Sequence, residues 1–446
     1  MAHIAVVGAG ITGITTAYSL LEYGHRVTVF DRHRYPAMET SFANGGQLSA
    51  SNAEVWNNPS TLIKALGWVF KSDAPLLLNP LPSWHKLSWL VEFVGQLPRY
   101  RANTLATVRL ALEARRQLFA IAEREGIDFD LERRGILHIY RDQKSFTRAE
   151  RVNALLREGG LERHAVTPEE IKAIEPALVG NFHGGFYTPS DATGDIHKFT
   201  RQLAAVCERR GMRFIGDVAV ERVAAAADGI GLDWRTSEQD NNNAVAVQKT
   251  SADAVVICAG VESRRLGASL GDRINIYPVK GYSITVELDD ATSRAGAPWV
   301  SLLDDESKIV SSRLGADRFR VAGTAELNGY NRDIRDVRID PLVAWTRHLF
   351  PSVLTERVIP WAGLRPMMPS CRALAPAAGR ACSTTPVTVI SAGPCRQRPR
   401  ASSRRPCRRR CPRPVHGTRG RSLGRRAEVV GERRHGAARA WRNKRD

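Results

Sequence analysis

The first thirty residues alternate short apolar runs with glycine and polar positions. Residues 4–7 are apolar and rich in β-branched side chains, which predicts a buried parallel strand. Residues 14, 17, 18 and 21 place apolar side chains on one face of a helix that stops at Gly24, and residues 26–30 predict a second strand. This strand–helix–strand order is typical of the first unit of a dinucleotide-binding fold.

The turn between this strand and helix has the pattern G-x-G-x-x-G. Gly8 permits the tight turn, Gly10 lets a pyrophosphate approach the backbone, and Gly13 lets the helix pack closely on the strand. Asp31, 18 residues after Gly13, is placed to accept hydrogen bonds from an adenosine ribose. The pattern does not distinguish FAD from NAD. The predicted cofactor residues of this unit are Gly8, Gly10, Ile11, Thr12, Gly13, Asp31 and Arg32.

A polar, glycine-containing loop at residues 39–47 follows, and it would lie beside the diphosphate and the reactive ring of a flavin. The alternative is an ordinary surface loop. Residues 213–223 predict a strand–turn–strand that returns to the first sheet, and residues 252–260 predict a buried strand that ends in small residues. Cofactor contacts that return about 200 residues later are typical of a two-domain flavoprotein. The predicted flavin residues are Thr40, Ser41, Asn44, Gly45, Gly46, Gln47, Val218, Ala259 and Gly260.

Several longer strings resemble the D-amino-acid dehydrogenase branch of the FAD-dependent amino-acid oxidases. They are ETSFANGGQLS, TPEEIKAIEPAL, GGFYTPSDATGDIHKFTRQLA, YPVKGYSITV, LLDDESKIVSSR, RVAGTAELNGYNRDIR and WAGLRPMMP, and the resemblance covers roughly residues 1–371. It implies an α/β fold, with a Rossmann-like FAD-binding domain and an α+β substrate domain built on a mixed sheet. It also implies hydride transfer from Cα of a D-amino acid to flavin N5, release of a 2-oxo acid and ammonia, and a quinone or carrier as electron acceptor.

On this basis the chain divides into segments that pass between two domains. Residues 1–50 and 191–265 are assigned to the FAD-binding domain, together with a return at 351–371. Residues 51–190 and 266–350 are assigned to the substrate or cap domain, and residues 372–446 to a disordered tail.

The implied chemistry needs a cation for the substrate carboxylate and an apolar wall for the substrate side chain. Arg365 is our choice for the carboxylate, because a guanidinium offers a planar, two-pronged grip; a structural salt bridge is the alternative. Tyr282 is predicted to aim its hydroxyl at the substrate, or simply to pack. Lys280 is predicted to lie near the flavin, or in solvent. No general base is required, and the histidines at 138, 183 and 197 are interpreted as structural.

Between residues 62 and 100, tryptophan and phenylalanine recur among leucines and lysines. Helices of the substrate-domain cap explain this pattern, and a membrane-surface patch that suits a quinone acceptor is the alternative. No stretch is long and apolar enough to predict a membrane span, and no signal peptide is evident. We therefore expect a cytoplasmic protein, with peripheral contact at the inner face of the cytoplasmic membrane as an option.

The net charge of +19 comes almost entirely from the last 75 residues. Residues 372–446 hold 21 Lys and Arg against 3 Asp and Glu, so the preceding body is close to neutral. The seven cysteines form no zinc-type pairs, and we expect neither a metal site nor a disulfide framework. The tail has one aromatic residue, Trp441, and no ordered basic spacing, so we do not expect specific nucleic-acid binding.

The tail has a second interpretation in the codons it implies. The family resembled above ends in a segment similar to NTGHGHLGWTLSAAT, a strand and a Gly-His-Gly loop that close on the flavin. Read one base out of step, codons for residues 381–393 permit Val-Phe-Tyr-Asn-Thr-Gly-His-Gly-His-Leu-Gly-Trp. We interpret the change of composition as a shift in reading frame after about residue 371, which predicts weak or absent FAD binding. The alternatives for function are a related flavin amine oxidase acting on glycine, sarcosine or hydroxyproline, a catalytically dead pseudoenzyme, and a binding protein with a basic tail.

Overall fold

The computed structural model describes residues 1–58, 75–226, 229–236 and 246–369, and the backbone of residues 380–381 and 387–391. All of these lie in one compact unit, Met1–Cys395. The tail predicted to be disordered, residues 372–446, contains two described strands, at residues 380–381 and 387–391, and both pair within the first sheet, so the prediction of disorder is wrong for them. The rest of the tail, and Cys371 before it, lie outside the described residues. The described residues form a mixed α/β fold, as expected.

The first sheet carries the strand–helix–strand unit predicted from the N-terminal pattern. Its order is β19-β20-β13-β1-β2-β9, with β1 parallel to both β2 and β13, β2 parallel to β9, and β20 antiparallel to β13. The strands are β1 (His3–Val7), β2 (Arg26–Phe30), β9 (Arg213–Ile215), β13 (Ala254–Ile257), β19 (Arg380–Ala381) and β20 (Val387–Ser391). The strands predicted at residues 4–7 and 26–30 are confirmed as β1 and β2. The chain also returns to the first sheet as predicted, through β9 in residues 213–223 and β13 in residues 252–260.

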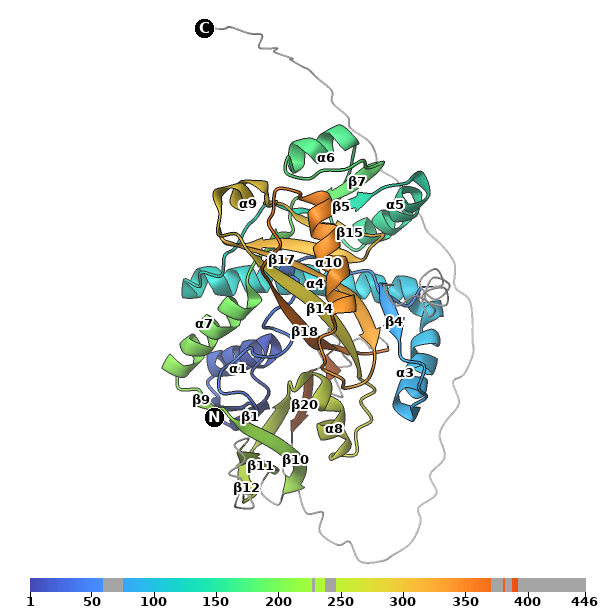
Figure 1. The fold of residues 1–446 in the computed structure, drawn as a ribbon. Helices are drawn as coiled ribbons and strands as arrows, with labels where there is room; N and C mark the ends of the chain where they lie inside the picture. Colours follow the sequence, from blue (N-terminus) through green and yellow to red (C-terminus); the bar gives the residue numbers. More distant parts are fainter. Residues whose placement is uncertain (59–74, 227–228, 237–245, 370–379, 382–386, 392–446) are drawn as a thin grey trace, which may run out of the picture. The chain divides into compact units, whose positions relative to one another are not determined.

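Each face of the first sheet is covered by a different layer. Helices α1 (Ile11–Glu22) and α7 (Ile196–Arg209) pack side by side on one face, where Ile14, Tyr18, Phe199 and Leu203 share a core (Figure 1). A three-stranded antiparallel sheet and α8 (Ser263–Ala268), preceded by the turn η2 (Gly260–Glu262), cover the other face. That small sheet consists of β10 (Val218–Ala226), β11 (Gly229–Thr236) and β12 (Gln248–Ala252).

The second sheet has nine strands of mixed direction. Its order is β18-β14-β17-β16-β15-β5-β7-β6, and β4 also pairs with β17. The strands are β4 (Leu76–Leu78), β5 (Ile136–Tyr140), β6 (His164–Val166), β7 (Gly184–Thr188), β14 (Tyr277–Glu287), β15 (Ser301–Asp304), β16 (Ile309–Leu314), β17 (Arg318–Leu327) and β18 (Val358–Met367). We expected residues 351–371 to return to the FAD-binding domain. Instead β18 forms the edge of the second sheet, because ten consecutive residues pair antiparallel with β14.

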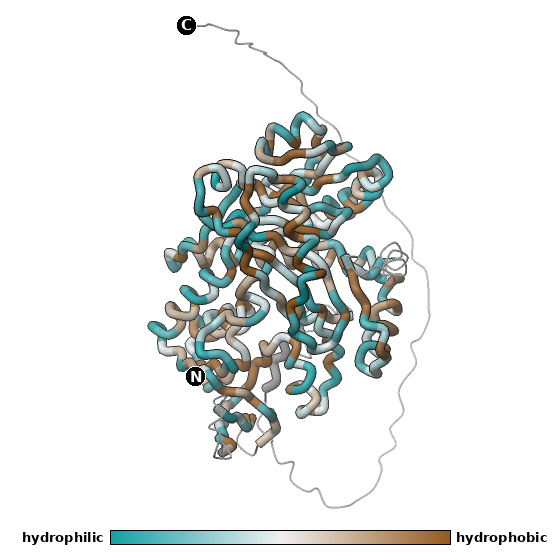
Figure 2. Tube along the Cα trace, viewed as in Figure 1, coloured by the Kyte–Doolittle hydropathy of each residue, from teal (hydrophilic) through white to brown (hydrophobic). Residues whose placement is uncertain are grey.

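Helix α10 (Asp336–Leu349) covers one face of the second sheet, and α3 (Trp84–Val94) covers part of the other (Figure 1). Apolar residues concentrate along the central strands (Figure 2). Helix α4 (Tyr100–Glu125) ends at Gly126 in the left-handed conformation. The other elements are η1 (Leu97–Arg99), α5 (Gln143–Glu158), α6 (Pro168–Ile174), α9 (Ala291–Gly296), and the paired strands β3 (Gln47–Leu48) and β8 (Ala192–Thr193).

Candidate flavin and substrate site

The glycine turn after β1 is built as its sequence pattern requires. Gly8 has a φ of +104°, and a Cβ there would lie 2.4 Å from the carbonyl oxygen of Cys258. A Cβ on Gly13 would lie 1.8 Å from the carbonyl oxygen of Gly8. Helix α1 begins with Gly10 as its N-cap, which has no side chain, and the Ile11 N–H donates to the Ser41 hydroxyl instead. Among the described residues, the N–H groups of Thr12 and Gly13 have no acceptor, so they are left for an anion such as a pyrophosphate.

Predicted cofactor residues from distant parts of the chain meet at this turn. The Asp31 carboxylate accepts hydrogen bonds from the Ala9 N–H (2.6 Å) and the His33 N–H (2.9 Å). Burial raises the pKa of Asp31, and these two hydrogen bonds oppose that effect. The Val218 N–H donates to the Asp31 carbonyl oxygen (2.9 Å), and Ala259 lies beside Gly8. The carboxyl ends of β1, β2 and β13 therefore meet at one edge of the first sheet, and Gly260 (φ +55°) lies in the turn after β13.

The loop at residues 39–47 is attached to the second sheet through its backbone. Three consecutive carbonyl oxygens accept hydrogen bonds from side chains of β14, β17 and β16. The bonds run from Ser283 Oγ to Ala43 O (2.9 Å), from Arg320 Nη1 to Asn44 O (3.4 Å) and from Ser312 Oγ to Gly45 O (2.7 Å). Within the described residues, the N–H groups of Asn44 and Gly45 have no acceptor. The loop thus turns its carbonyls toward the sheet and keeps free donors.

The same loop also contacts the first helix and the sheet edge. The Ser41 hydroxyl accepts a hydrogen bond from the Ile11 N–H (3.1 Å), at the first residue of α1. Thr40 Oγ1 donates to the Leu364 carbonyl oxygen on β18 (2.9 Å), and Gln47 Nε2 donates to the Leu302 carbonyl oxygen on β15 (2.9 Å). The loop is therefore a fixed connection between the glycine turn and the second sheet, rather than an ordinary surface loop.

Glu39, at the start of the loop, is held by three cationic or hydrogen-bonding side chains. Its carboxylate lies 3.0 Å from His33 Nε2, 2.9 Å from Arg332 Nη1 and 3.6 Å from Arg32 Nε. Burial acts to raise the pKa of Glu39, but the hydrogen bonds from His33 and Arg332 and the nearby positive charges outweigh it and lower the pKa to about 2. Glu39 is therefore an anion at all physiological pH values.

Arg365 lies on the sheet face that holds the loop. It pairs in register with Val279 of β14, and its side chain lies over Gly281, where a Cβ would be 2.3 Å from Nη2. It is half-buried, and it forms no ion pair or hydrogen bond with any described residue. Burial lowers the pKa of Arg365, although a guanidinium remains charged. A partly desolvated cation without a partner favours the binding of an anion.

Lys280 and Tyr282 lie on the opposite face of β14 from Arg365. Tyr282 is buried in the core beneath α10, and its hydroxyl donates to Glu326 Oε2 (2.7 Å). Lys280 is fully buried, with Nζ 2.6 Å from Asn331 Oδ1, 3.0 Å from the Asp333 carbonyl oxygen and 3.3 Å from Glu326 Oε2. The structure does not bring these two side chains to Arg365 or to the loop, and their satisfied buried network favours a structural role.

Burial shifts the pKa values of Lys280 and Tyr282 in this network. It lowers the pKa of Lys280, an effect that the neighbouring Glu326 carboxylate opposes. Burial, together with the hydrogen bond to Glu326, raises the pKa of Tyr282 to about 12. The tyrosine is therefore a neutral hydrogen-bond donor, and the lysine and Glu326 form a buried ion pair.

The residues of the loop and turn fit a dinucleotide cofactor of the FAD type. Asp31 stands at the end of β2. Among the described residues, the N–H groups of Thr12 and Gly13 in the helix and of Asn44 and Gly45 in the loop have no acceptor. The sequence did not predict Ser283, Arg320 and Ser312, which fix this loop, because each is separated from it by more than 200 residues. Among the described residues, no cluster of three or more His, Cys, Asp or Glu side chains is placed to hold a metal.

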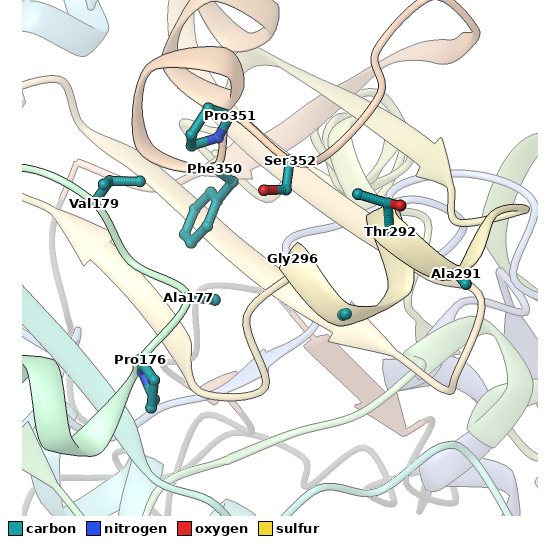
Figure 3. A pocket seen from close by; sticks show the side chains of 10 residues that line it. Pro176, Ala177, Val179, Ala291, Thr292, Gly296, Phe350, Pro351 and Ser352 are labelled. Carbon is teal, nitrogen blue, oxygen red and sulfur yellow. The ribbon is translucent and has the colours of Figure 1, made fainter.

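A surface hollow of about 660 Å³ lies elsewhere (Figure 3). Its walls come from α9, from the end of α10 and from the segment after α6, and they include Ala177, Thr292 and Phe350. None of the predicted site residues lines it. It therefore does not belong to the candidate site.

Known proteins are similar to this chain over most of its length. The family model described as FAD dependent oxidoreductase (DAO) matches residues 3–395. A protein named D-amino acid dehydrogenase 3 from Mesorhizobium japonicum is 61% identical over 370 residues, covering 83% of this chain and 88% of the relative. A D-amino acid dehydrogenase from Paramagnetospirillum magneticum is 43% identical over 378 residues, covering 82% and 85%.

The fold is also similar to that of solved flavoenzymes. Glycine oxidase from Geobacillus kaustophilus superposes with a TM-score of 0.60 at 21% identity, over 82% of this chain and 84% of that enzyme. This likeness supports the fold alone. No helix in the part of the chain that the structure describes is long and apolar enough to cross a membrane.

Proposed function

Because the chain belongs to the family of FAD-dependent oxidoreductases, we propose that it catalyses the oxidative deamination of D-amino acids. The 61% identity to a relative named D-amino acid dehydrogenase supports this substrate class. The single structural observation that carries the proposal is the Arg365 guanidinium, which has no partner among the described residues and lies on the sheet face that anchors the loop at 39–47.

The residues of this chain supply binding and orientation. Helix α1 and Asp31 would hold the dinucleotide end of FAD, and the N–H groups of Asn44 and Gly45 in the loop at 39–47 would be available to its flavin end. Arg365 grips the substrate carboxylate with two parallel hydrogen bonds and so fixes the direction of the Cα–H bond. FAD, when bound, supplies the hydride acceptor for oxidation at Cα. The imino acid product then reacts with water to give a 2-oxo acid and ammonia.

Reduction of the bound flavin by substrate tests this function. Purified full-length protein, reconstituted with FAD, is mixed anaerobically with D-alanine, and loss of the visible absorbance of the oxidised flavin is followed. Reduction by D-alanine and not by L-alanine is expected, and Arg365→Gln should raise the concentration needed for half-maximal reduction. Equal reduction by both enantiomers, or by glycine alone, would contradict the substrate class.

The electron acceptor is proposed to be a membrane quinone, with the protein bound peripherally to the lipid surface. Support comes from α3, whose outward face exposes Trp84 (82%), Leu87 (47%), Val91 (73%) and Val94 (44%) at helical spacing. The inward face buries Trp89 and Phe93 against the second sheet, so the cap-helix interpretation accounts for only half of the apolar residues. An apolar helix face in solvent is typical of an interfacial helix. Residues 62–74 of the predicted patch lie outside the described residues.

We also propose that the chain beyond about residue 371 is read out of frame. The alignments to the two relatives span 370 and 378 residues, close to the length of the chain before its composition changes. Sequencing the gene across codons 365–400 tests this proposal directly. An uninterrupted single frame without an insertion or deletion relative to those relatives would overturn it. A purified protein fully loaded with FAD would contradict the weak FAD binding expected of the shifted chain.

A further inference from the structure

Two glycines face each other across β14 and β18 beside the candidate carboxylate site. Gly281 and Gly363 are direct partners in the antiparallel register. Side chains at directly opposite positions start about 5 Å apart. The space above each glycine is taken by a side chain of β18. The guanidinium of Arg365 lies 2.3–2.8 Å from an ideal Cβ on Gly281, and the indole of Trp361 lies 2.0–2.7 Å from an ideal Cβ on Gly363.

The glycine pair thus forms a floor on which a cation and an aromatic ring lie at neighbouring positions. Trp361 and Arg365 share a sheet face because they are four residues apart on one strand. Any side chain larger than hydrogen at either glycine would displace one of them. The two glycines therefore explain how both groups reach the same small area of the face.

Trp361 is only partly covered by the rest of the protein. It is half-buried, and its indole N–H has no acceptor among the described residues, although buried tryptophans usually find one. Phe42, 37% exposed, lies 6.5 Å away between ring centroids and contacts His197 edge-on at 4.9 Å. Trp361 also pairs in register with Ser283, which fixes the loop through Ala43. The ring therefore lies between the loop and Arg365.

We propose that Trp361 is the specificity-determining residue for the substrate side chain. This inference rests on the proposed function, in which Arg365 holds the carboxylate. A carboxylate held over Gly281 places the groups on the adjacent carbon within reach of the indole above Gly363. An apolar or aromatic substituent loses water against the ring, whereas a charged one loses hydration without a partner. The site therefore selects amino acids with apolar or aromatic side chains.

Binding of two non-reacting carboxylates tests this role without catalysis. Benzoate carries an aromatic ring and acetate a methyl group, and both are titrated by calorimetry into the full-length protein with excess FAD. Trp361→Leu should weaken benzoate binding at least tenfold and acetate binding less than threefold (on the order of the effect of lost apolar contacts in a pocket). The matched control is Trp299→Leu, a tryptophan 36% exposed beside Arg134 and Arg313, which should change neither affinity.

A second variant keeps the tryptophan but moves it. Gly363→Ala places a methyl group where the indole lies, so the benzoate-to-acetate affinity ratio should fall as it does in Trp361→Leu. Equal losses for both carboxylates, or no loss, in both variants would overturn the inference. Arg365→Gln separates the two proposals, because it should weaken both ligands. If the unmodified chain binds neither carboxylate, the anchor proposed at Arg365 is wrong and the role of Trp361 is wrong with it.

Discussion

Arg332 donates a hydrogen bond to Glu39 over 2.9 Å, and this ion pair joins the loop at residues 39–47 to the segment that follows β17. Glu39 belongs to the loop that connects the glycine turn to the sheet. Arg332 lies in residues 328–335, between β17 and α10, and neighbouring atoms of that segment bind the buried Lys280. The pair therefore couples the position of the loop to the buried network on the far face of β14.

Breaking this pair should loosen the loop and speed FAD release. Because both side chains are partly exposed, the pair contributes on the order of 0.2–1 kcal/mol, so Glu39→Gln or Arg332→Gln should raise the FAD dissociation rate by up to about fivefold. Stopped-flow recovery of flavin fluorescence measures the rate. The double variant should be no faster than either single variant. Arg357→Gln removes an exposed pair with Asp289 elsewhere and should leave the rate unchanged.

The stabilising effect of Glu39 should depend on pH in a defined direction. Its pKa falls from an ordinary value of 4.5 to about 2 on folding, so the folded state prefers the carboxylate. The contribution is complete above about pH 4.5 and is lost as pH falls toward 2. Urea denaturation of the parent and Glu39→Gln proteins should therefore show a difference in stability at pH 6 that shrinks by pH 3.5. A difference that grows on acidification would contradict this assignment.

Lys280→Met should destabilise the fold rather than act on the chemistry. The substitution leaves the Glu326 carboxylate buried with Arg335 as its remaining charged partner, and removal of one member of a buried pair costs about 3–5 kcal/mol. Thermal unfolding measures the loss. Lys308→Met removes an exposed pair with Asp305 and should cost less than about 1 kcal/mol. A Lys280→Met protein that keeps its stability but fails to reduce flavin would indicate a catalytic role for Lys280.

Local patterns in the sequence predicted the first sheet well, because the glycine turn, α1 and Asp31 are encoded within thirty consecutive residues. They could not place Lys280 and Tyr282. Strand alternation puts both on one face of β14, but only the pairing with β18 shows that Arg365 lies on the other face. That register joins residues about 85 positions apart, and no local pattern specifies it.

The same limit explains the residues that were missed. Ser283, Arg320 and Ser312 fix the loop from three different strands, and each looks like an ordinary strand residue in the sequence. Trp361 lies four residues before Arg365, in the same string WAGLRPMMP. Its closeness to the guanidinium depends on the pairing of two glycines, which the sequence alone does not reveal.

Gly281→Ala should impair substrate binding while leaving the fold intact. The new methyl group would meet only the far end of the Arg365 side chain, which can move, so the loss of stability should be small. The displaced guanidinium loses charged hydrogen bonds worth about 1.5–3 kcal/mol, so KM for D-alanine should rise about 10- to 100-fold. Gly231→Ala is the matched control, because its nearest neighbour would be 3.8 Å away, and it should leave KM unchanged. An unchanged KM in Gly281→Ala would contradict the carboxylate assignment for Arg365.

The outward face of α3 provides a test of peripheral membrane contact. Trp84→Ser combined with Val91→Ser removes the two most exposed apolar side chains of this face, so binding to liposomes should fall about tenfold or more. Co-sedimentation with vesicles of neutral and anionic lipid measures the binding, and quinone-analogue reduction in the presence of vesicles reports electron transfer. Val337→Ser combined with Leu354→Ser removes exposed apolar side chains elsewhere and should have no effect. If the α3 variant and its control sediment alike, the exposed face of α3 does not bind lipid. If the α3 variant loses binding to anionic vesicles but not to neutral ones, the contact belongs instead to basic residues, because insertion of apolar side chains acts on both lipid types.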